Sequence, residues 1–329
     1  MEEQSRTYIL EASDLSVSFE TDAGEVQAVR DVSLSLKEGE VLAIVGESGC
    51  GKSVLCKSLM KMLPENARIK SGKILANGID ITGYKERDMA KLRGTLFSMV
   101  FQDPMTALNP IMKVGEQIAE VIRKHQTRED KTAREMAEDM LAMVGIPRER
   151  YGEYPHQFSG GMKQRVVIAM ALACNPHLLL ADEPTTALDV TIQAQVLDMM
   201  DDLKKKYNTA MILITHDLGV VGRMCDNVAV IYAGEVLEYG SKEEIFLHPQ
   251  HPYTIGLFGA IPDLSVDTRR LANIEGLPPD PTDLPTGCCF NPRCPHATDK
   301  CRTIKFPLTE VRPGHFCSCP YCEAAEKED

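Results

Sequence analysis

The sequence predicts an α/β fold in which parallel strands alternate with helical crossovers. A glycine-rich segment at 46–53 lies between an apolar run at 41–45 and a helical pattern at 54–62. Two further apolar runs, at 178–180 and 211–214, are separated by a longer helical pattern. Strands joined through helices pair in parallel, because each helix returns the chain to the end of the sheet at which the previous strand began.

The N-terminal part has the alternation of half-buried strands. Apolar and polar residues alternate around Leu15, Val17 and Phe19, and again around Val32, Leu34 and Leu36. A turn is expected at 22–24, and Asn77-Gly78 is a strong hairpin signal. These patterns predict β-strands in the first part of the chain.

The middle of the chain is helical, and the end is not periodic. From 114 to 144 the apolar residues follow helical spacing, and the helix between the two later strands spans 190–206. A hairpin is expected around Ala233-Gly234. Proline and glycine become frequent beyond Pro249, so we place a domain boundary there, with one domain at 1–250 and a C-terminal extension at 251–329.

Composition narrows the class of protein. The 329 residues carry a net charge of −12, whereas nucleic-acid binders are normally basic. The acidic start, Met1-Glu2-Glu3-Gln4, is unlike a signal peptide, and the two stretches that lack acidic and basic residues are too polar to cross a membrane. We therefore expect a soluble cytosolic protein that acts at a membrane only through a partner.

The glycine-rich segment has the pattern G-x-x-x-x-G-K-S. Its residues are Gly46, Glu47, Ser48, Gly49, Cys50, Gly51, Lys52 and Ser53. Between a strand and a helix, this pattern wraps backbone N–H groups around the phosphates of a nucleotide. Lys52 then reaches the β- and γ-phosphates, and Ser53 holds Mg²⁺. The alternative, a chance glycine-rich turn, is disfavoured by the flanking strand and helix.

The strand at 178–180 leads into two carboxylates. Asp182 is placed to hold Mg²⁺, and Glu183 to orient and deprotonate the attacking water. Taken alone, the pair could be two solvated acids at the end of a strand. Together with Lys52, it predicts hydrolysis of a nucleoside triphosphate.

A second glycine motif, Phe158-Ser159-Gly160-Gly161-Met162, opens an apolar helix 23 residues before Asp182. Taken alone it is a helix cap, but with the other motifs it resembles the signature of the ATP-binding-cassette (ABC) ATPases. The usual glutamine after the glycines is methionine here. The resemblance covers about 8–245 and implies a RecA-like mixed-sheet core, an antiparallel β subdomain and a helical subdomain at about 104–175.

The resemblance also implies roles for further residues. Gln102 is similar to the Q-loop glutamine, which contacts Mg²⁺ and senses the membrane partner, and His216 to the switch histidine at the γ-phosphate. Asp189 is similar to the D-loop aspartate, which communicates across a dimer. Phe19 is a candidate platform for adenine, although its alternation with Val17 fits a core position equally well.

The resemblance implies a complete set of site residues. The nucleotide contacts are Phe19, Gly46, Glu47, Ser48, Gly49, Cys50, Gly51, Lys52, Ser53, Val54, Gln102, Ser159, Gly160, Gly161, Asp182 and Asp189; the catalytic residues are Lys52, Gln102, Glu183 and His216; the Mg²⁺ ligands are Ser53, Gln102 and Asp182. The phosphate loop of one subunit and the signature of another would enclose each ATP in a head-to-tail dimer, closed by ATP and loosened by hydrolysis.

The C-terminal extension resembles that of oligopeptide, dipeptide and nickel importer ATPases. The matching segments include 248–254 and 287–295. In this branch the cysteines resemble ligands of a [4Fe–4S] cluster, here Cys288, Cys294, Cys301 and Cys319, with Zn²⁺ as the alternative metal. Cys317 and Cys322 are substitutes for the fourth ligand, and Cys289 is a bystander. A cysteine-rich tail without metal is the remaining alternative.

The sequence is therefore identified as an ATPase subunit of a peptide-type ABC importer, with nickel or another solute as the alternative cargo. The expected partners are a second related ATPase subunit, two membrane permease subunits and an external substrate-binding protein. Two other classes remain: an ABC ATPase that acts on ribosomes or DNA, and a regulatory module that binds ATP without turnover. The acidic charge and the single set of motifs oppose the first, and the presence of Glu183 and His216 opposes the second.

Overall fold

The computed structural model describes residues 8–185, 188–259 and 274–321. The chain divides into two compact units. The first consists of Met1–Leu10, Ser35–Val41 and Leu75–Thr215, and the second of Glu11–Leu34, Leu42–Ile74 and His216–Asp329. Among the described residues, no helix has the length and apolar character needed to cross a membrane.

The first unit contains three parallel strands in the order β6-β7-β8. Their bounds are Phe97–Val100, Leu178–Asp182 and Ala210–Ile214. All residues of β7 and β8 are buried, as expected for strands covered on both faces. The helix α7 (Val190–Tyr207) connects β7 to β8, which confirms the predicted crossover.

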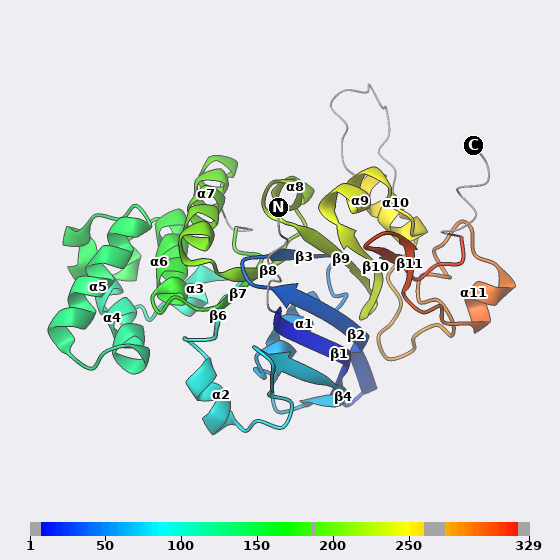
Figure 1. The fold of residues 1–329 in the computed structure, drawn as a ribbon, viewed down its shortest axis with the longest axis horizontal. Helices are drawn as coiled ribbons and strands as arrows, with labels where there is room; N and C mark the ends of the chain where they lie inside the picture. Colours follow the sequence, from blue (N-terminus) through cyan, green and yellow to red (C-terminus); the bar gives the residue numbers. More distant parts are fainter. Residues whose placement is uncertain (1–7, 186–187, 260–273, 322–329) are drawn as a thin grey trace. The chain divides into compact units, whose positions relative to one another are not determined.

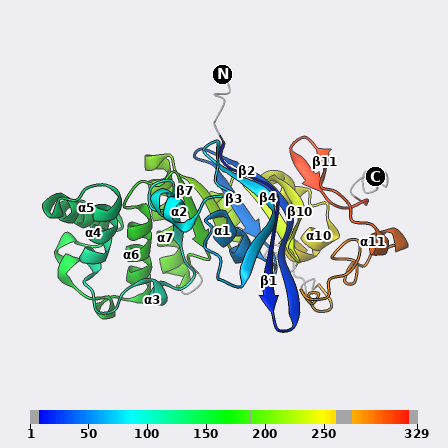
Figure 2. The ribbon, with the colours of Figure 1, turned by 90° about the horizontal axis from the view of Figure 1, so that it is seen from below.

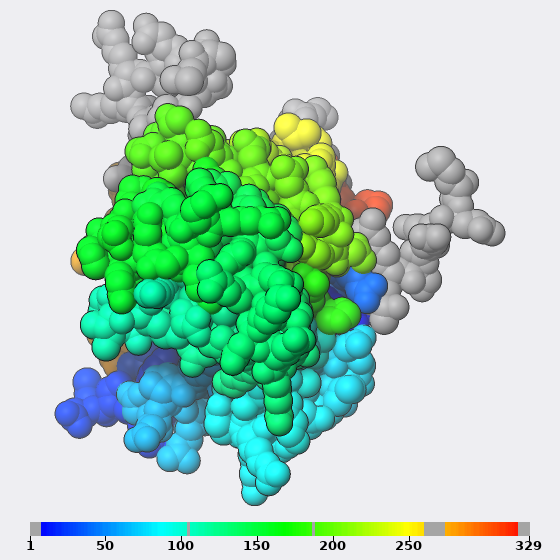
Figure 3. Space-filling model, turned by 90° about the vertical axis from the view of Figure 1, so that its left-hand side faces the viewer, coloured from blue at the N-terminus to red at the C-terminus, as the bar shows by residue number. Residues whose placement is uncertain are grey.

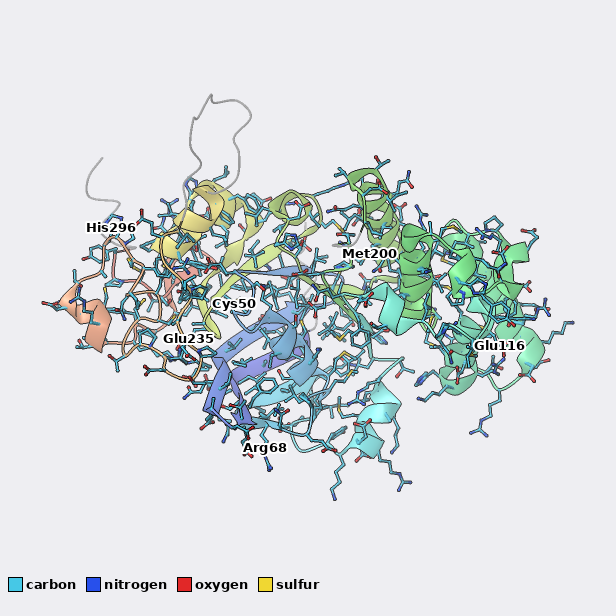
Figure 4. All side chains as sticks on the ribbon, turned by 180° about the vertical axis from the view of Figure 1, so that it is seen from behind. Cys50, Arg68, Glu116, Met200, Glu235 and His296 are labelled. Atoms are coloured by element: carbon cyan, nitrogen blue, oxygen red, sulfur yellow. The ribbon has the colours of Figure 1, made fainter. Side chains whose placement is uncertain are left out.

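Helices dominate the middle of this unit, and α4, α5 and α6 lie side by side (Figures 1 and 2). The helices of the unit are α2 (Glu86–Leu92), α3 (Pro104–Ala107), α4 (Val114–His125), α5 (Asp130–Met143), η1 (Arg148–Gly152), η2 (Pro155–Gln157) and α6 (Gly160–Leu172). The helical pattern predicted for 114–144 is thus two helices with a break at 126–129. Val114, Ile118 and Ile122 bury one face of α4, and Tyr151 of η1 donates to Glu116 on the same helix at 2.7 Å. Figure 3 shows the surface of these helices, and Figure 4 labels Glu116.

The second unit contains a mixed sheet in the order β3-β9-β10-β12-β11. The strands are β3 (Val41–Val45), β9 (Asn227–Tyr232), β10 (Glu235–Ser241), β11 (Thr309–Arg312) and β12 (His315–Cys317); the first residue of β3 belongs to the other unit. The helices of this unit are α1 (Lys52–Leu59), α8 (Leu218–Met224), α9 (Lys242–Leu247), α10 (Pro252–Gly259) and α11 (Asp299–Thr303). β3 pairs with β9 in parallel, and β10 pairs antiparallel with β9 through the predicted turn at Ala233-Gly234.

The C-terminal extension adds two strands to this sheet. β12 pairs with β10, so that Glu238 lies opposite Cys317, and β11 pairs with β12. Segments on the two sides of the predicted boundary at 250 therefore share a sheet, while the boundary itself stays a prediction. The strands have only three and four residues, which is too short for a period to be seen in the sequence.

The remaining strands form a four-stranded sheet in the order β2-β1-β4-β5. Their bounds are Tyr8–Thr21 for β1, Gly24–Lys37 for β2, Ala67–Ala76 for β4 and Ile79–Asp80 for β5. The predicted hairpin turn at Asn77-Gly78 connects β4 to β5 antiparallel, and both turn residues have positive φ angles of 48° and 75°. That conformation suits asparagine and glycine.

Candidate functional site

The predicted phosphate loop, 46–53, connects β3 to α1 in the second unit. β3 is buried throughout, and Gly51 precedes α1 with a φ of 104°. A Cβ atom on Gly51 would lie 2.2 Å from the Ala28 carbonyl oxygen, and one on Gly46 would lie 2.1 Å from that of Ile231. Since both obstacles are backbone atoms, only glycine allows the loop to follow this path.

Lys52 lies over the loop that precedes it. Its ammonium group donates to the carbonyl oxygens of Gly46 and Glu47, each at 2.8 Å, and lies 3.6 Å from the Cys50 sulfur. The side chain is only 6% exposed. A positive charge is therefore fixed at the N-terminus of α1, where the helix already favours an anion.

Cys50 (labelled in Figure 4) is buried within this loop. Burial raises the pKa of its thiol, and the nearby Lys52 opposes the shift without cancelling it. The thiol therefore stays protonated at neutral pH, and its small side chain fills space. Phe19 on β1 is half-buried, whereas Val17, two residues earlier, is fully buried. Part of the Phe19 ring is therefore accessible, as a platform for adenine requires.

In the first unit, the predicted catalytic residues Gln102 and Glu183 meet at the carboxyl end of β7, next to the predicted Mg²⁺ ligand Asp182. Asp182 ends the strand and is 5% exposed. Glu183 follows in the left-handed conformation, with a φ of 47°, and its N–H donates to the Ile214 carbonyl at 3.0 Å. The Gln102 amide nitrogen donates to a Glu183 carboxylate oxygen at 2.9 Å. A carboxylate oriented in this way can accept a proton from a water molecule.

The predicted signature segment starts α6 in the same unit. The Ser159 hydroxyl accepts from the Met162 N–H at 3.4 Å, and Ser159 and Gly160 are exposed. A Cβ atom on Gly161 would lie 2.4 Å from Ile192 of α7. The Asp189 carboxylate accepts from the Ile192 N–H at 2.9 Å, so the predicted D-loop residue caps the helix against which the signature packs.

The sequence did not point to Arg150, which contacts the signature segment at several places. Its guanidinium lies 4.4 Å from the centre of the Phe158 ring and donates to the Met162 sulfur at 3.3 Å. It also donates to the Gln157 carbonyl at 3.2 Å and to the Glu153 carboxylate. The unusual methionine of the signature thus has an identifiable partner. An arginine nine residues before Ser159 carries no signal in a single sequence.

The predicted switch residue, His216, is exposed in the second unit. It comes just before α8, whose first turn is capped by the neighbouring Asp217. That carboxylate accepts from the N–H groups of Gly219 and Val220 at 2.9 and 3.3 Å. The local structure after β8 is therefore fixed by a helix cap.

The four cysteines predicted as cluster ligands all lie in the C-terminal extension. The pKa of Cys319 is raised to about 12, chiefly by burial, and the proximity of Cys288, Cys294 and Cys301 adds to the shift. The Cys288 N–H donates to the Cys301 carbonyl at 2.9 Å, which closes the loop between them. Within the described ranges, no group of three or more histidine, cysteine or acidic side chains is arranged to hold a metal ion.

Two other cysteines of the extension have different surroundings. Cys289 is fully buried, and its thiol lies 3.7 Å from the Tyr232 carbonyl oxygen, which supports its prediction as a bystander. Cys317 is buried in β12 opposite Glu238. Cys322 lies outside the described residues. Of the two described candidates for the fourth ligand, Cys317 is disulfide-bonded, whereas Cys319 has a free thiol whose pKa is raised in part by Cys288, Cys294 and Cys301.

Comparisons with known proteins match most of the chain. The family described as "ABC transporter" matches residues 29–186, and "Oligopeptide/dipeptide transporter, C-terminal region" matches residues 237–301. The chain is 50% identical over 315 residues to the dipeptide transport ATP-binding protein DppD of Bacillus subtilis (strain 168), covering 94% of both chains. It is 49% identical over 319 residues to the oligopeptide transport ATP-binding protein OppD of Escherichia coli (strain K12), covering 96% of this chain and 94% of that one.

Solved structures give the same result for the fold. A dimeric ATP-binding cassette in a post-hydrolysis state, bound to ADP and Pi, superposes with a TM-score of 0.64 at 26% identity. The match covers 71% of this chain and 98% of the other. The predicted α/β fold with a mixed sheet and an antiparallel sheet is thereby confirmed.

Proposed function

This chain belongs to the ABC transporter family, within its oligopeptide and dipeptide branch, and on that premise we propose that it hydrolyses ATP to power the import of peptides across a membrane. The proposal is carried by the near-full-length similarity to DppD and OppD, which includes the C-terminal extension. The hydrogen bond between Gln102 and Glu183 supports it, because that contact orients a carboxylate at the end of a buried strand.

In this proposal each polar residue has a separate task. Lys52 would bind the β- and γ-phosphates. Ser53, Asp182 and Gln102 would hold Mg²⁺, whose charge would offset that of the phosphates. Glu183 accepts the proton of the attacking water, and His216 contacts the γ-phosphate. A carboxylate as buried as that of Asp182 fits a cation ligand, since a bound ion offsets the cost of burying its charge.

The partners follow from the same premise. The signature of a second, related ATPase subunit would cover the ATP bound at the phosphate loop, so ATP would close the dimer and hydrolysis would open it. Two permease subunits and an external binding protein would complete the importer, with this chain on the cytoplasmic face of the membrane. The net charge of −12 supports a protein partner over nucleic acid.

The substitution Glu183→Gln tests the catalytic assignment. In the assembled transporter, it should keep Mg–ATP binding within about twofold and lower phosphate release at least about a hundredfold, because the amide cannot accept the proton. Light scattering should also show ATP-dependent closure of the ATPase subunits. The exposed Glu149→Gln is the matched control and should retain normal turnover. Normal turnover by Glu183→Gln would refute the role of Glu183 as the base.

We also propose that Cys288, Cys294, Cys301 and Cys319 hold a [4Fe–4S] cluster, with Zn²⁺ as the alternative. Besides burial, the proximity of Cys288, Cys294 and Cys301 raises the pKa of Cys319, and the proximity of Cys294 and Cys301 raises that of Cys288, which supports this ligand set. These four thiolates would be the protein's ligands to such a cluster, so the loss of one of them should release iron.

Metal analysis of protein purified without oxygen tests the cluster. We expect about four iron atoms per chain and a paramagnetic signal after reduction, both lost in Cys294→Ser. The matched control is Cys174→Ser, a buried thiol outside the extension, which should keep its iron. Stoichiometric zinc without iron would contradict the cluster and favour the alternative.

A further inference from the structure

Glu47, the second residue of the phosphate loop, is held from outside the loop by two residues of the C-terminal segment. Arg293 donates to both of its carboxylate oxygens, at 2.6 and 3.0 Å. The Glu47 N–H donates to the Tyr253 hydroxyl at 2.9 Å. The side chain and the backbone of one loop residue are therefore fixed at the same time, by residues more than 200 positions away in the sequence.

Arg293 is itself held in place. It also donates to the Tyr232 hydroxyl at 3.3 Å and to the backbone carbonyls of Glu275 and Ile274, at 3.0 and 3.2 Å. Its side chain is 5% exposed, in contrast to the surface ion pairs of the chain. A bidentate arginine–carboxylate ion pair with little access to water is stronger, and more specific in geometry, than an exposed ion pair.

The contact leads directly to the predicted phosphate-binding lysine. The same Glu47 whose side chain binds Arg293 offers its carbonyl to the Lys52 ammonium at 2.8 Å. A shift of Glu47 would therefore move an acceptor of Lys52. The Glu47 N–H is already engaged by Tyr253, so this part of the loop cannot turn to satisfy another acceptor without breaking that bond.

The extension and the loop also share the walls of a cavity of about 280 Å³. Ser48, Gly49 and Cys50 line it on the loop side, and Pro278, Pro279 and Leu284 on the extension side. The Gln27 N–H donates to the Pro281 carbonyl at 3.4 Å, which joins β2 to the same stretch. The extension and the loop thus face each other across this cavity, in addition to the contacts of Glu47 with Arg293 and Tyr253.

We propose that Arg293 is a positioning residue for the phosphate loop, and that through Glu47 the C-terminal extension sets the affinity of this loop for Mg–ATP. The inference depends on the proposed function, because it requires ATP to bind at 46–53. Arg293 does not touch the reacting atoms in this proposal. It acts by keeping the loop in the conformation that places Lys52.

Equilibrium binding of Mg–ATP to the full-length chain, with turnover measured in the assembled transporter, tests this proposal. Arg293→Ala should weaken ATP binding about tenfold and raise KM by a similar factor, since it removes a charge-assisted contact to the loop. The value of kcat at saturating ATP should change less than about twofold. Arg302→Ala is the matched control, because this arginine of the same extension is exposed and its side chain lies 3.9 Å from that of Asp299, on the same helix and away from the loop. This variant should bind ATP normally.

Two further variants separate a positioning role from a fault in folding. Glu47→Gln removes the charge on the loop side and leaves the extension intact, and it should weaken ATP binding about threefold or more. The exchange of both charges, Glu47→Arg with Arg293→Glu, should restore part of the affinity that Arg293→Ala loses. Unchanged binding in both single variants would overturn the proposal, as would losses of affinity that only follow losses of thermal stability. If the wild-type chain bound no ATP, the proposed function itself would fail.

Discussion

Glu183 is in a backbone conformation that a glutamate seldom adopts. Its φ of 47° places it in the left-handed region, where a side chain with a Cβ atom is strained. The bond from its N–H to Ile214 and the bond from Gln102 to its carboxylate hold it there. Strain of this kind persists where the surroundings enforce it, which is a frequent feature of functional sites.

Substitution of Gln102 tests whether its contact matters for chemistry. Gln102→Ala should lower kcat about tenfold and leave ATP binding within about threefold, because the carboxylate loses the amide that orients it. Gln102→Glu places a second carboxylate beside Glu183, which raises the apparent pKa of the pair and shifts the rise of the pH–rate profile to higher pH. Phosphate release and ATP binding measured from pH 5.5 to 9 would show both effects.

The control for this prediction is Gln126→Ala. Gln126 is an exposed glutamine at the end of α4 and donates to the Ala173 carbonyl at 3.2 Å. Its loss should leave kcat and the pH profile unchanged. A Gln102→Ala variant with wild-type kcat would show that Glu183 needs no orientation by this amide.

At the scale of elements, the strands and helices that follow strong periodicity could be predicted from the sequence. The phosphate loop, β7 with its two carboxylates and the α7 crossover agree with the expectations, because burial on both faces makes the strands continuously apolar. The strands β11 and β12 could not be predicted. β12 is held by pairing with β10, a long-range interaction that no local pattern encodes, and β11 is held by pairing with β12.

The candidate site has the same limit. Motif residues such as Lys52 and Glu183 can be proposed from the sequence because their chemistry fixes both residue type and spacing. Arg150 and Arg293 could not, since each acts through contacts that the fold creates. Arg293 lies 246 positions from Glu47, and only the structure shows that they meet.

The η1 helix supports the signature element through Arg150, and this support can be measured. Arg150→Ala removes the cation–π contact with Phe158 and the bonds to Met162 and Gln157. We expect a lower free energy of unfolding, and a fall in ATPase activity of about fivefold or more in the assembled complex. Urea unfolding and phosphate release provide the two readouts.

A second variant at Arg150 and a control variant at Arg148 make this prediction more specific. Arg150→Lys keeps the charge but not the planar fork, and should be intermediate in both readouts. Arg148→Ala is the control, because this arginine of η1 is exposed and forms a surface ion pair with Asp139. Equal effects of Arg148→Ala and Arg150→Ala would show that the signature gains nothing specific from Arg150.

At the scale of the whole molecule, the second unit buries a polar network where the extension joins the sheet. Glu238 and His315 are both fully buried and lie 2.7 Å apart, Nε2 to Oε1. Glu238 also accepts from the N–H groups of Gln250 and His251, at 2.7 and 2.9 Å. These bonds satisfy a carboxylate that would otherwise be costly to bury, and they connect β10 and β12 to the start of α10.

His251 in this network predicts how global stability depends on pH. Burial lowers its pKa from 6.5 to about 4, and the nearby Glu238 opposes the shift only in part. Its Nδ1 accepts from the Tyr253 N–H at 3.0 Å, which requires the neutral ring. Between pH 6.5 and 4 the unfolded chain therefore binds more protons at this position than the folded chain, so stability falls as the pH is lowered through this range.

The expected loss from His251 alone is about 3 kcal/mol between pH 7 and pH 4, from about 1.36 kcal/mol per unit of pKa shift. His251→Gln removes the titrating group, so its free energy of unfolding should fall less steeply over this range. The exposed His156→Gln is the control and should keep the wild-type slope. Urea unfolding at half-unit steps of pH measures each slope. If His251→Gln has the wild-type slope, the acid sensitivity comes from other groups and the neutral ring of His251 contributes nothing to it.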